Sequence, residues 1–465
     1  MSDQYTRGSR SGSRPTIEGG TAADIAKSAE EAIRTGRFGP GDRLPTIRAL
    51  AASLGVSPAT VASAYGELRR RGVVAAAGRR GTRVTERPPL IIAGSPVSGI
   101  PGGARDLATG NPDPNLLPSL GDALAAVDPA PHLYGSPTKL ESLVDLARKR
   151  FEADGLPAAH VAVASGALDG IERVLAAHLR PGDMVAVEDP GYARIFDLLR
   201  GGGYELEGFG GDDSGPLPEE LVRALRRGAR AAILTPRAQN PTGAALDERR
   251  ARDLRAMLRG RPDVLVIEDD HAGAIAGAPA FTTCHRSRPR FAIVRSVSKA
   301  LGPDLRVALI SGDAETIARV EGRQLLGTGW VSTILQQVVA RLWSDPRVTE
   351  LMERAGRTYS LRRSALLKAL AAQGIAARGW SGLNVWIPVP EEAGAVSALL
   401  QRGWAVAAGE RWRLGSGVAL PINAARLRTP PAIRVTVATL LPEEADRFAT
   451  DLADALAIGT RTYSA

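Results

Sequence analysis

The sequence has one cysteine, Cys284, and only five lysines among its 59 basic residues. A single cysteine excludes an internal disulfide and is typical of proteins of the reducing cytoplasm, where we expect this chain to reside. No apolar stretch is long enough to cross a membrane, and the first residues lack the apolar segment of a signal peptide. We therefore expect no membrane partner, and no metal site either. Aromatic side chains make up only 4% of the chain, so Ala, Val, Leu and Ile must build the core.

The charged residues are distributed unevenly along the chain. Residues 1–87 contain fifteen basic and eight acidic side chains, a net charge of +7, which leaves +2 of the total +9 for residues 88–465. A chain of 465 residues is long enough for two or three domains. A basic N-terminal part on a nearly neutral body favours a nucleic-acid-binding domain joined to a second unit, although an Arg-rich solvated surface has the same composition.

Apolar residues at helical spacing predict three helices in residues 16–87. The second helix is expected to begin after the cap Thr46 and the third after Ser57, with Pro58 at its first position. Two short strands are expected around Val73–Val74 and Thr82–Val84, with a turn at 78–81 between them. The apolar faces are assigned to Ile25, Ala29, Ala32 and Ile33, to Ile47, Leu50, Ala51 and Leu54, and to Val61, Tyr65 and Leu68. This order is typical of a winged helix-turn-helix, whose third helix enters the major groove of DNA.

The sequence of this N-terminal part also resembles a known family. The run Gly41-Asp-Arg-Leu-Pro-Thr-Ile-Arg-Ala-Leu-Ala, followed by Leu54-Gly-Val-Ser-Pro-Ala-Thr-Val, resembles the GntR family of bacterial regulators. The resemblance implies a double-stranded DNA operator as partner. The residues that we expect to contact DNA are Thr46, Arg48, Ser57, Thr60, Arg79, Arg80 and Gly81. The alternative is a small three-helix interaction domain.

Composition suggests the remaining boundaries. Residues 1–15 are polar and basic and are expected to form a disordered tail, and residues 16–87 form the winged helix-turn-helix domain. Residues 88–105 are rich in Pro, Gly and Ser, a composition that predicts a linker. Residues 106–460 are left for one large domain.

Five apolar strand-like segments alternate with helical segments in the large domain. Continuous apolar strands separated by helices predict a mostly parallel, doubly covered α/β sheet, in which ligands bind at the carboxyl ends of the strands. A long helix near Arg347–Ala372 and strands at Leu383–Ile387, Trp404–Ala407 and Ile433–Val437 predict a smaller C-terminal α+β subdomain. The five segments are Val161–Ala164, Met184–Val187, Ala231–Leu234, Val264–Ile267 and Phe291–Val294.

Polar groups follow each of these strands. They are Ser165-Gly166-Ala167, then Tyr192, then Asn240, then Asp269 with His271, and finally Ser296, Ser298 and Lys299, with Arg306 seven residues on. Together they offer a phosphate cradle, a flat ring, an amide, a carboxylate and an amine. That set fits a phosphorylated aromatic cofactor with an aldehyde group, because a lysine amine can form a covalent bond with an aldehyde and a guanidinium cannot usefully do so.

The same motifs, in the same order, resemble those of fold-type I aminotransferases over residues 106–460, and the whole chain resembles the MocR subfamily of GntR regulators. The resemblance implies that Lys299 carries pyridoxal 5'-phosphate covalently and that Asp269 pairs with its ring nitrogen. It assigns Asn240 to the ring hydroxyl and Tyr192 to the ring face. It assigns the phosphate to Ser165, Gly166, Ala167, Ser296, Ser298 and Arg306, and to Tyr134 from the other subunit of a homodimer.

Two further positions bear on the ligand. The resemblance gives Arg434 the role of gripping an effector's carboxylate in a bidentate fork, although a structural ion pair would also explain it. His271 stands where these regulators usually carry a tyrosine that contacts the ring oxygen, and the charge of a histidine is sensitive to pH. His271, Tyr192 and Tyr134 could equally have purely structural roles.

The sequence therefore predicts a DNA-binding transcriptional regulator that senses a small amino compound, or pyridoxal phosphate itself, through an aminotransferase-like domain. Bound to DNA, it would be associated with the bacterial nucleoid. One alternative is an active aminotransferase whose DNA-binding domain serves autoregulation. Another is a repressor whose large domain is a cofactor-free dimerisation scaffold.

Overall fold

The computed structural model describes residues 17–35, 37–39, 41–70, 73–76, 81–85, 100–414 and 429–462. The expected tail at 1–15, the turn residues Arg79 and Arg80, and residues 88–99 of the expected linker lie outside the described residues. The chain divides into two compact units, Met1–Ile91 and Ile92–Ala465, and each is described by itself.

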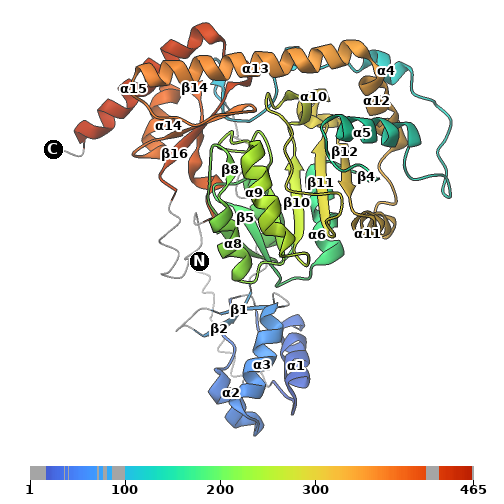
Figure 1. The fold of residues 1–465 in the computed structure, drawn as a ribbon. Helices are drawn as coiled ribbons and strands as arrows, with labels where there is room; N and C mark the ends of the chain where they lie inside the picture. The colour runs from blue at the N-terminus through green and yellow to red at the C-terminus, as the bar shows by residue number, and fades with distance from the viewer. Residues whose placement is uncertain are drawn as a thin grey trace, which may run out of the picture. The chain divides into compact units, whose positions relative to one another are not determined.

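The N-terminal unit contains three helices and a two-stranded hairpin (Figure 1). Thr46 caps the second helix by accepting a hydrogen bond from the Ala49 N–H at 3.2 Å, and Ser57 caps the third from the Thr60 N–H at 3.1 Å, as the sequence predicted. The strands pair in antiparallel register. The elements are α1 (Ala22–Arg34), α2 (Ile47–Leu54), α3 (Pro58–Arg70), β1 (Val74–Ala76) and β2 (Thr82–Val84).

The core of this unit lies where α1, α2 and α3 meet. Ile25, Val61 and Leu68 are completely buried, and the hydroxyl of the buried Tyr65 donates a hydrogen bond to the Pro45 carbonyl at 2.9 Å. The expectation that Ile47 faces this core is wrong, because its side chain is 36% exposed. Helical side chains tilt toward the N-terminus, so the side chain of this first helical residue extends past the start of α2.

The second unit is built on a seven-stranded sheet with the order β4-β12-β11-β10-β9-β5-β6. Its five predicted strands are present, and β5, β6, β9, β10 and β11 run parallel. The sequence reading missed β12, which pairs antiparallel with β4 and β11, and the edge strand β6, whose alternating glutamates hide its apolar pattern. The strands are β4 (His160–Ala164), β5 (Met184–Glu188), β6 (Glu205–Phe209), β9 (Ala231–Leu234), β10 (Leu265–Asp270), β11 (Phe291–Ser296) and β12 (Ala308–Gly312).

Helices cover both faces of this sheet, and two separate apolar clusters form its core. One cluster joins the sheet to α6 (Ala167–His178), α7 (Ala193–Gly201) and α11 (Ala314–Leu325). The other joins it to α5 (Glu141–Ala153), α8 (Pro218–Arg226), α9 (Glu248–Arg259), α12 (Thr333–Ser344) and the first half of α13 (Pro346–Ala372). The short helices α4 (Gly121–Ala125) and α10 (Ser298–Leu301) lie at the ends of these layers.

The second half of α13 packs on a small C-terminal sheet with the order β13-β16-β15. The strand expected at Trp404–Ala407 is two short strands, since β14 pairs with β3 whereas β15 pairs with β16. Strand β3 begins at Arg105, the last residue assigned to the linker. The elements are β3 (Arg105–Asp106), β13 (Asn384–Pro388), α14 (Glu392–Gln401), β14 (Trp404–Ala405), β15 (Ala407–Ala408), β16 (Ala432–Thr436) and α15 (Ala445–Thr462).

None of the described helices is by itself long and apolar enough to cross a membrane, and only α2 and α3 together, bent by 120° at their break, meet that length and composition.

The separate core of the N-terminal unit leads to a stability prediction. Leu68→Ala should destabilise this unit by about 2–5 kcal/mol, because it leaves a cavity at a completely buried position. All six tryptophans lie in the second unit. In a denaturant titration, far-ultraviolet circular dichroism should therefore show an earlier transition in the variant while the tryptophan fluorescence transition stays in place.

The matched control is Ile47→Ala, at the exposed start of α2, which should change stability by less than about 0.5 kcal/mol. A shift of the tryptophan transition in Leu68→Ala, equal to that in circular dichroism, would show that the two units unfold together.

Candidate functional site

A cavity of about 270 Å³ opens at the carboxyl ends of β9, β10 and β11. Residues from the start of α6 and α7, from α10 and from β16 complete its wall. The structure thus brings together most of the cofactor and effector residues expected from sequence. Those that line the cavity are Ala167, Tyr192, Asn240, Asp269, His271, Ser296, Ser298, Lys299, Arg306 and Arg434.

Asp269, near the end of β10, carries an uncompensated buried carboxyl. Its Oδ1 is buried and has no hydrogen-bond partner. Burial, followed by the negative charge of Asp270, raises the pKa of Asp269 to about 7. A buried acceptor without a donor is costly, so this oxygen is suited to a ligand that supplies an N–H group.

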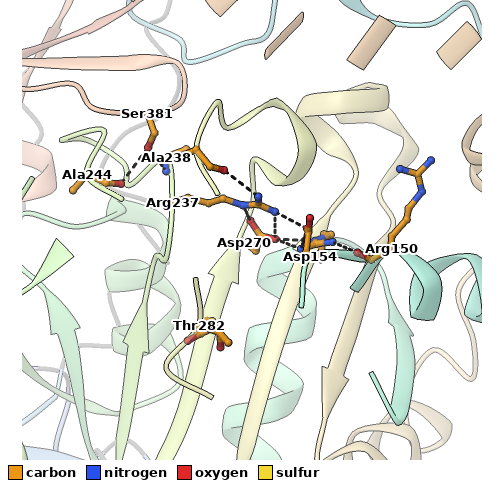
Figure 2. A network of polar contacts seen from close by, with 11 residues as sticks. Arg150, Asp154, Arg237, Ala238, Ala244, Asp270, Thr282 and Ser381 are labelled. Carbon is orange, nitrogen blue, oxygen red and sulfur yellow. Dashed lines mark hydrogen bonds and ion pairs between the residues drawn. The ribbon is translucent and has the colours of Figure 1, made fainter. Parts of the chain in front are cut away.

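The charge of the neighbouring Asp270, in contrast, is compensated by two arginines. Arg237 donates to its Oδ1 at 2.8 Å, and Arg295, its cross-strand neighbour on β11, donates to its Oδ2 at 2.7 Å. Asp154, at the end of α5, bridges both arginines (Figure 2). The two guanidinium groups hold the pKa of Asp270 well below its usual range, so it stays ionised.

Lys299 lies in the first turn of α10, and its amine faces the cavity. Its Nζ donates a hydrogen bond to the Gly110 carbonyl at 2.7 Å. Gly110 has φ 74°, and a Cβ there would lie 3.3 Å from the Arg434 guanidinium, so a glycine suits this position between the two cations. Burial, followed by the positive charge of Arg434, lowers the pKa of Lys299 to about 8. Roughly a tenth of this amine is therefore unprotonated at pH 7, far more than for an ordinary lysine with a pKa of about 10.4.

His271 lines the cavity close to Lys299. Burial, followed by the positive charge of Lys299, lowers the pKa of His271 to about 4. The ring is therefore neutral at physiological pH, and the pH-sensitive charge expected from its residue type is absent in the folded protein. A neutral imidazole can still donate one hydrogen bond.

The phosphate side of the cavity is formed by the start of α6, two serines and Arg306. The Ser296 and Ser298 hydroxyls lie 3.0 Å apart. Arg306 adopts the left-handed conformation with φ 47°, a strained geometry that is common at functional sites. Ala167 and Leu168 line the cavity.

Two further residues that the sequence assigned to the phosphate, Ser165 and Gly166, lie beside the phosphate side of the cavity and do not line it. The Ser165 N–H donates to the Asp169 carboxylate at 2.8 Å. The Ser165 carbonyl accepts from Arg306 at 3.4 Å, and a Cβ on Gly166 would collide with the Arg306 guanidinium. Ser165 and Gly166 therefore position Arg306.

Arg434 is a buried cation whose hydrogen bonds all go to neutral oxygens. It donates to the Ala108 carbonyl, and to the Asn240 Oδ1 at 3.2 Å. Its Nε is buried without a partner, and its guanidinium lies 4.4 Å from the centroid of the Trp412 ring. It forms no ion pair with the described residues, so the alternative of a structural ion pair lacks support there. Burial, followed by the charge of Arg411, lowers the pKa of Arg434 to about 9, and the group remains charged at neutral pH.

Tyr134 is not part of this cavity. Its side chain is 93% exposed and packs edge-on against Trp330 at 5.4 Å. The structure of one chain therefore leaves Tyr134 free to reach another molecule.

Two arginines of the cavity wall were missed from the sequence, Arg194 in α7 and Arg411 in the 3₁₀ turn Gly409–Trp412. Arg194 stands two residues after Tyr192, which could have indicated it. Arg411 has no local motif, and only the packing of the C-terminal part brings it to the cavity.

Of the expected DNA-binding residues, Thr46, Arg48, Ser57, Thr60 and Gly81 are exposed or half-buried, and Arg79 and Arg80 lie outside the described residues. Arg48 and Ser57 are exposed and Thr60 is half-buried, and the Ser57 and Thr60 hydroxyls lie 2.8 Å apart. Gly81 has φ 86°, and a Cβ there would collide with the Arg43 side chain, so the hairpin requires glycine at this point. Exposed Thr46 completes this group of described residues.

Two families match this chain. The family described as aminotransferase class I and II matches residues 105–452, and that described as bacterial regulatory proteins, gntR family, matches residues 21–84. The vitamin B6 salvage pathway transcriptional repressor PtsJ of Salmonella typhimurium is 38% identical over 95% of this chain and 99% of its own length. The pyridoxine biosynthesis transcriptional regulator PdxR of Corynebacterium glutamicum is 27% identical over 73% of this chain and 76% of its own.

Solved aminotransferase structures share the fold of the second unit. The kynurenine aminotransferase of Pyrococcus horikoshii superposes with a TM-score of 0.68 at 20% identity, over 77% of this chain and 92% of its own. The α-aminoadipate aminotransferase LysN of Thermus thermophilus superposes with a TM-score of 0.67 at 23% identity, over 79% of this chain and 95% of its own. The expected fold-type I architecture is thereby confirmed.

The environment of Lys299 predicts an unusual reactivity. In cofactor-free protein, the rate at which trinitrobenzenesulfonate labels Lys299 should reach half its maximum near pH 8, against about 10.4 for an ordinary lysine amine. Arg434→Gln should move this midpoint upward because it removes a like charge, whereas Arg434→Lys should move it less. Peptide mapping by mass spectrometry separates Lys299 from exposed Lys368, the internal comparison. Equal midpoints for the two lysines would contradict the prediction.

Proposed function

The chain belongs to the gntR family of bacterial regulatory proteins, in the MocR-type branch that carries an aminotransferase class I and II domain, and from this premise we propose that it is a transcriptional regulator whose DNA binding is set by pyridoxal 5'-phosphate and an amino compound in the cavity around Lys299. The observation that carries the proposal is the buried, unpartnered Oδ1 of Asp269 within reach of the same cavity as the Lys299 amine. A site with both groups suits a ring nitrogen and an aldehyde in one ligand.

The residues of the cavity fit this cofactor. When bound, pyridoxal phosphate supplies an aldehyde that bonds covalently to amines and a ring that withdraws electrons. Lys299 would hold the aldehyde, Asp269 the ring nitrogen, Asn240 the ring hydroxyl and Tyr192 one face of the ring. The phosphate would be held by Arg306, the Ser296 and Ser298 hydroxyls and the start of α6, with Ser165 and Gly166 supporting Arg306.

His271 would act as a neutral neighbour of the ring. Because its pKa lies near 4, it adds no positive charge beside Lys299 at physiological pH. It would take the place of the tyrosine beside the ring oxygen, and as a neutral group it adds no charge that would shift the pKa of the Lys299 amine.

Arg434 would receive the carboxylate of the amino compound. Its guanidinium is buried, charged and bound only to neutral oxygens, so a carboxylate would supply the counter-charge that the described residues do not. The names of PtsJ and PdxR connect those relatives with vitamin B6, which supports the cofactor itself as part of the sensed signal.

We propose that the active form is a homodimer bound to two DNA half-sites. Tyr134 lies away from the cavity of its own chain and is 93% exposed, so it can serve a phosphate only in a second copy. A single winged helix contacts few base pairs, and linking two of them raises affinity through effective concentration. A ligand would change the DNA-bound population only through different affinities for the two states of this dimer. Its site of action would be the nucleoid in the cytoplasm.

Lys299→Ala tests the proposal directly. The wild-type protein, supplied with pyridoxal phosphate and reduced with borohydride, should carry a stable covalent adduct, and the variant should carry none because it lacks the amine. The variant should keep its fold and its basal DNA binding, and lose the change in DNA binding caused by cofactor or amines. Lys368→Ala, at an exposed position of α13, is the matched control. A wild-type-like adduct in Lys299→Ala would overturn the assignment.

Arg48→Ala tests the DNA-binding surface. Binding to a duplex of random sequence should weaken, and the slope of log K against log salt should fall by about one unit if Arg48 neutralises one phosphate. Fluorescence anisotropy at several salt concentrations measures both quantities. Arg286→Ala, which removes an exposed arginine of the second unit, should leave the slope unchanged. The same slope in wild type and Arg48→Ala would remove Arg48 from the interface.

A further inference from the structure

The wall of the cavity carries more positive charge than the proposed function uses. Five cationic side chains line it, and Asp269 is the one carboxylate among its described lining residues. Lys299 and Arg306 are assigned to the cofactor, and Arg434 to one carboxylate. The two that remain are Arg194 and Arg411.

Arg411 lies beside Arg434 in a firmly held turn. Its guanidinium is 4.5 Å from the centroid of the Trp412 ring, and that of Arg434 is 4.4 Å from the same centroid. The turn is fixed because the Glu410 N–H donates to the buried Glu392 carboxylate at 2.8 Å. Both guanidinium groups therefore pack against the same ring, and the positive charge of Arg411 is one cause of the lowered pKa of Arg434, so an anion bound near both would relieve the repulsion.

The described residues leave both spare arginines without an ion pair. The Nε of Arg411 is buried and has no hydrogen-bond partner. Arg194 lines the cavity and forms no hydrogen bond or salt bridge among the described residues. The charge of Asp197 acts on both arginines, but Asp197 forms no salt bridge with either, and its Oδ2 is buried without a hydrogen-bond partner. Asp197 can offset at most one of the two charges. Residues 415–428, which lie outside the described ranges, contain no Asp or Glu in their sequence.

We propose that Arg411, together with Arg194, forms a second anion site next to Arg434, so that the amino compound bound by this protein is an amino dicarboxylic acid. This inference rests on the proposed function and specifies its ligand. The first carboxylate binds Arg434, the amine faces Lys299, and the second carboxylate binds Arg411 and Arg194. Charge-assisted hydrogen bonds to guanidinium groups in a partly enclosed cavity favour the charged side chain over a neutral amide of the same shape.

Pairs of amino acids that differ in one charge test this assignment. L-Glutamate and L-glutamine are nearly identical in shape, as are L-aspartate and L-asparagine. Each is titrated into the cofactor-loaded, full-length protein, and its affinity is read from the visible absorbance of the cofactor and from the shift in melting temperature. In at least one pair, the acid should bind about tenfold or more tightly than its amide. Equal affinities within both pairs, or binding by none of the four, would overturn the inference.

Substitution then locates the effect. Arg411→Gln should reduce the preference for the acid to about twofold or less, because the second anion site loses its charge while Arg434 remains for the carboxylate that acid and amide share. Arg411→Lys should retain part of the preference, and Arg286→Gln, which removes one exposed charge, should retain all of it. An unchanged preference in Arg411→Gln would overturn the role of Arg411.

The cofactor site and the dicarboxylate ligand can be rejected separately. If the wild type forms no borohydride-trapped adduct with pyridoxal phosphate, the proposed function itself fails. If the adduct forms but acids and amides bind alike, the cofactor site stands and only the dicarboxylate ligand is rejected.

Discussion

The ion pairs of Asp270 with Arg237 and Arg295 hold the end of β10 in place, and the cavity is built around that strand end. Asp154 closes the network from α5, so elements far apart in the sequence meet at one buried charge. Removing one partner of such a buried group leaves an uncompensated charge and typically costs about 3–5 kcal/mol. With Asp270 satisfied, its neighbour Asp269 is held next to the cavity with an oxygen that no described residue satisfies.

The cavity therefore combines a strand end held by ion pairs with buried polar groups that lack partners among the described residues. Asp269 Oδ1 lacks a donor, and Arg434 and Arg411 each have a buried Nε without a partner and form no salt bridge among the described residues. Desolvation makes each of these groups costly until a ligand satisfies it. A ligand that satisfied these groups would gain affinity from them, and it would regulate DNA binding only if it bound two states of the protein with different affinities.

The same electrostatics distinguish one lysine among the five of the chain. Lys299 is buried beside Arg434, and both effects disfavour its protonated form. His271, kept neutral by burial and by Lys299, adds no charge to this effect. The exposed Lys27, Lys149 and Lys368 lack that environment.

Local sequence determined the parts of this protein that depend on neighbours in the chain. The caps at Thr46 and Ser57, the apolar strands and the motifs that end them were predictable because hydrogen bonds and burial at these points follow from a few adjacent residues. Tertiary structure alone decided the exposure of Ile47, the split between an ionised Asp270 and an unpartnered Asp269, and the meeting of Arg194, Arg411 and Arg434. These outcomes depend on how far each group is removed from water and on which distant charges surround it, and neither quantity is encoded in any short stretch of sequence.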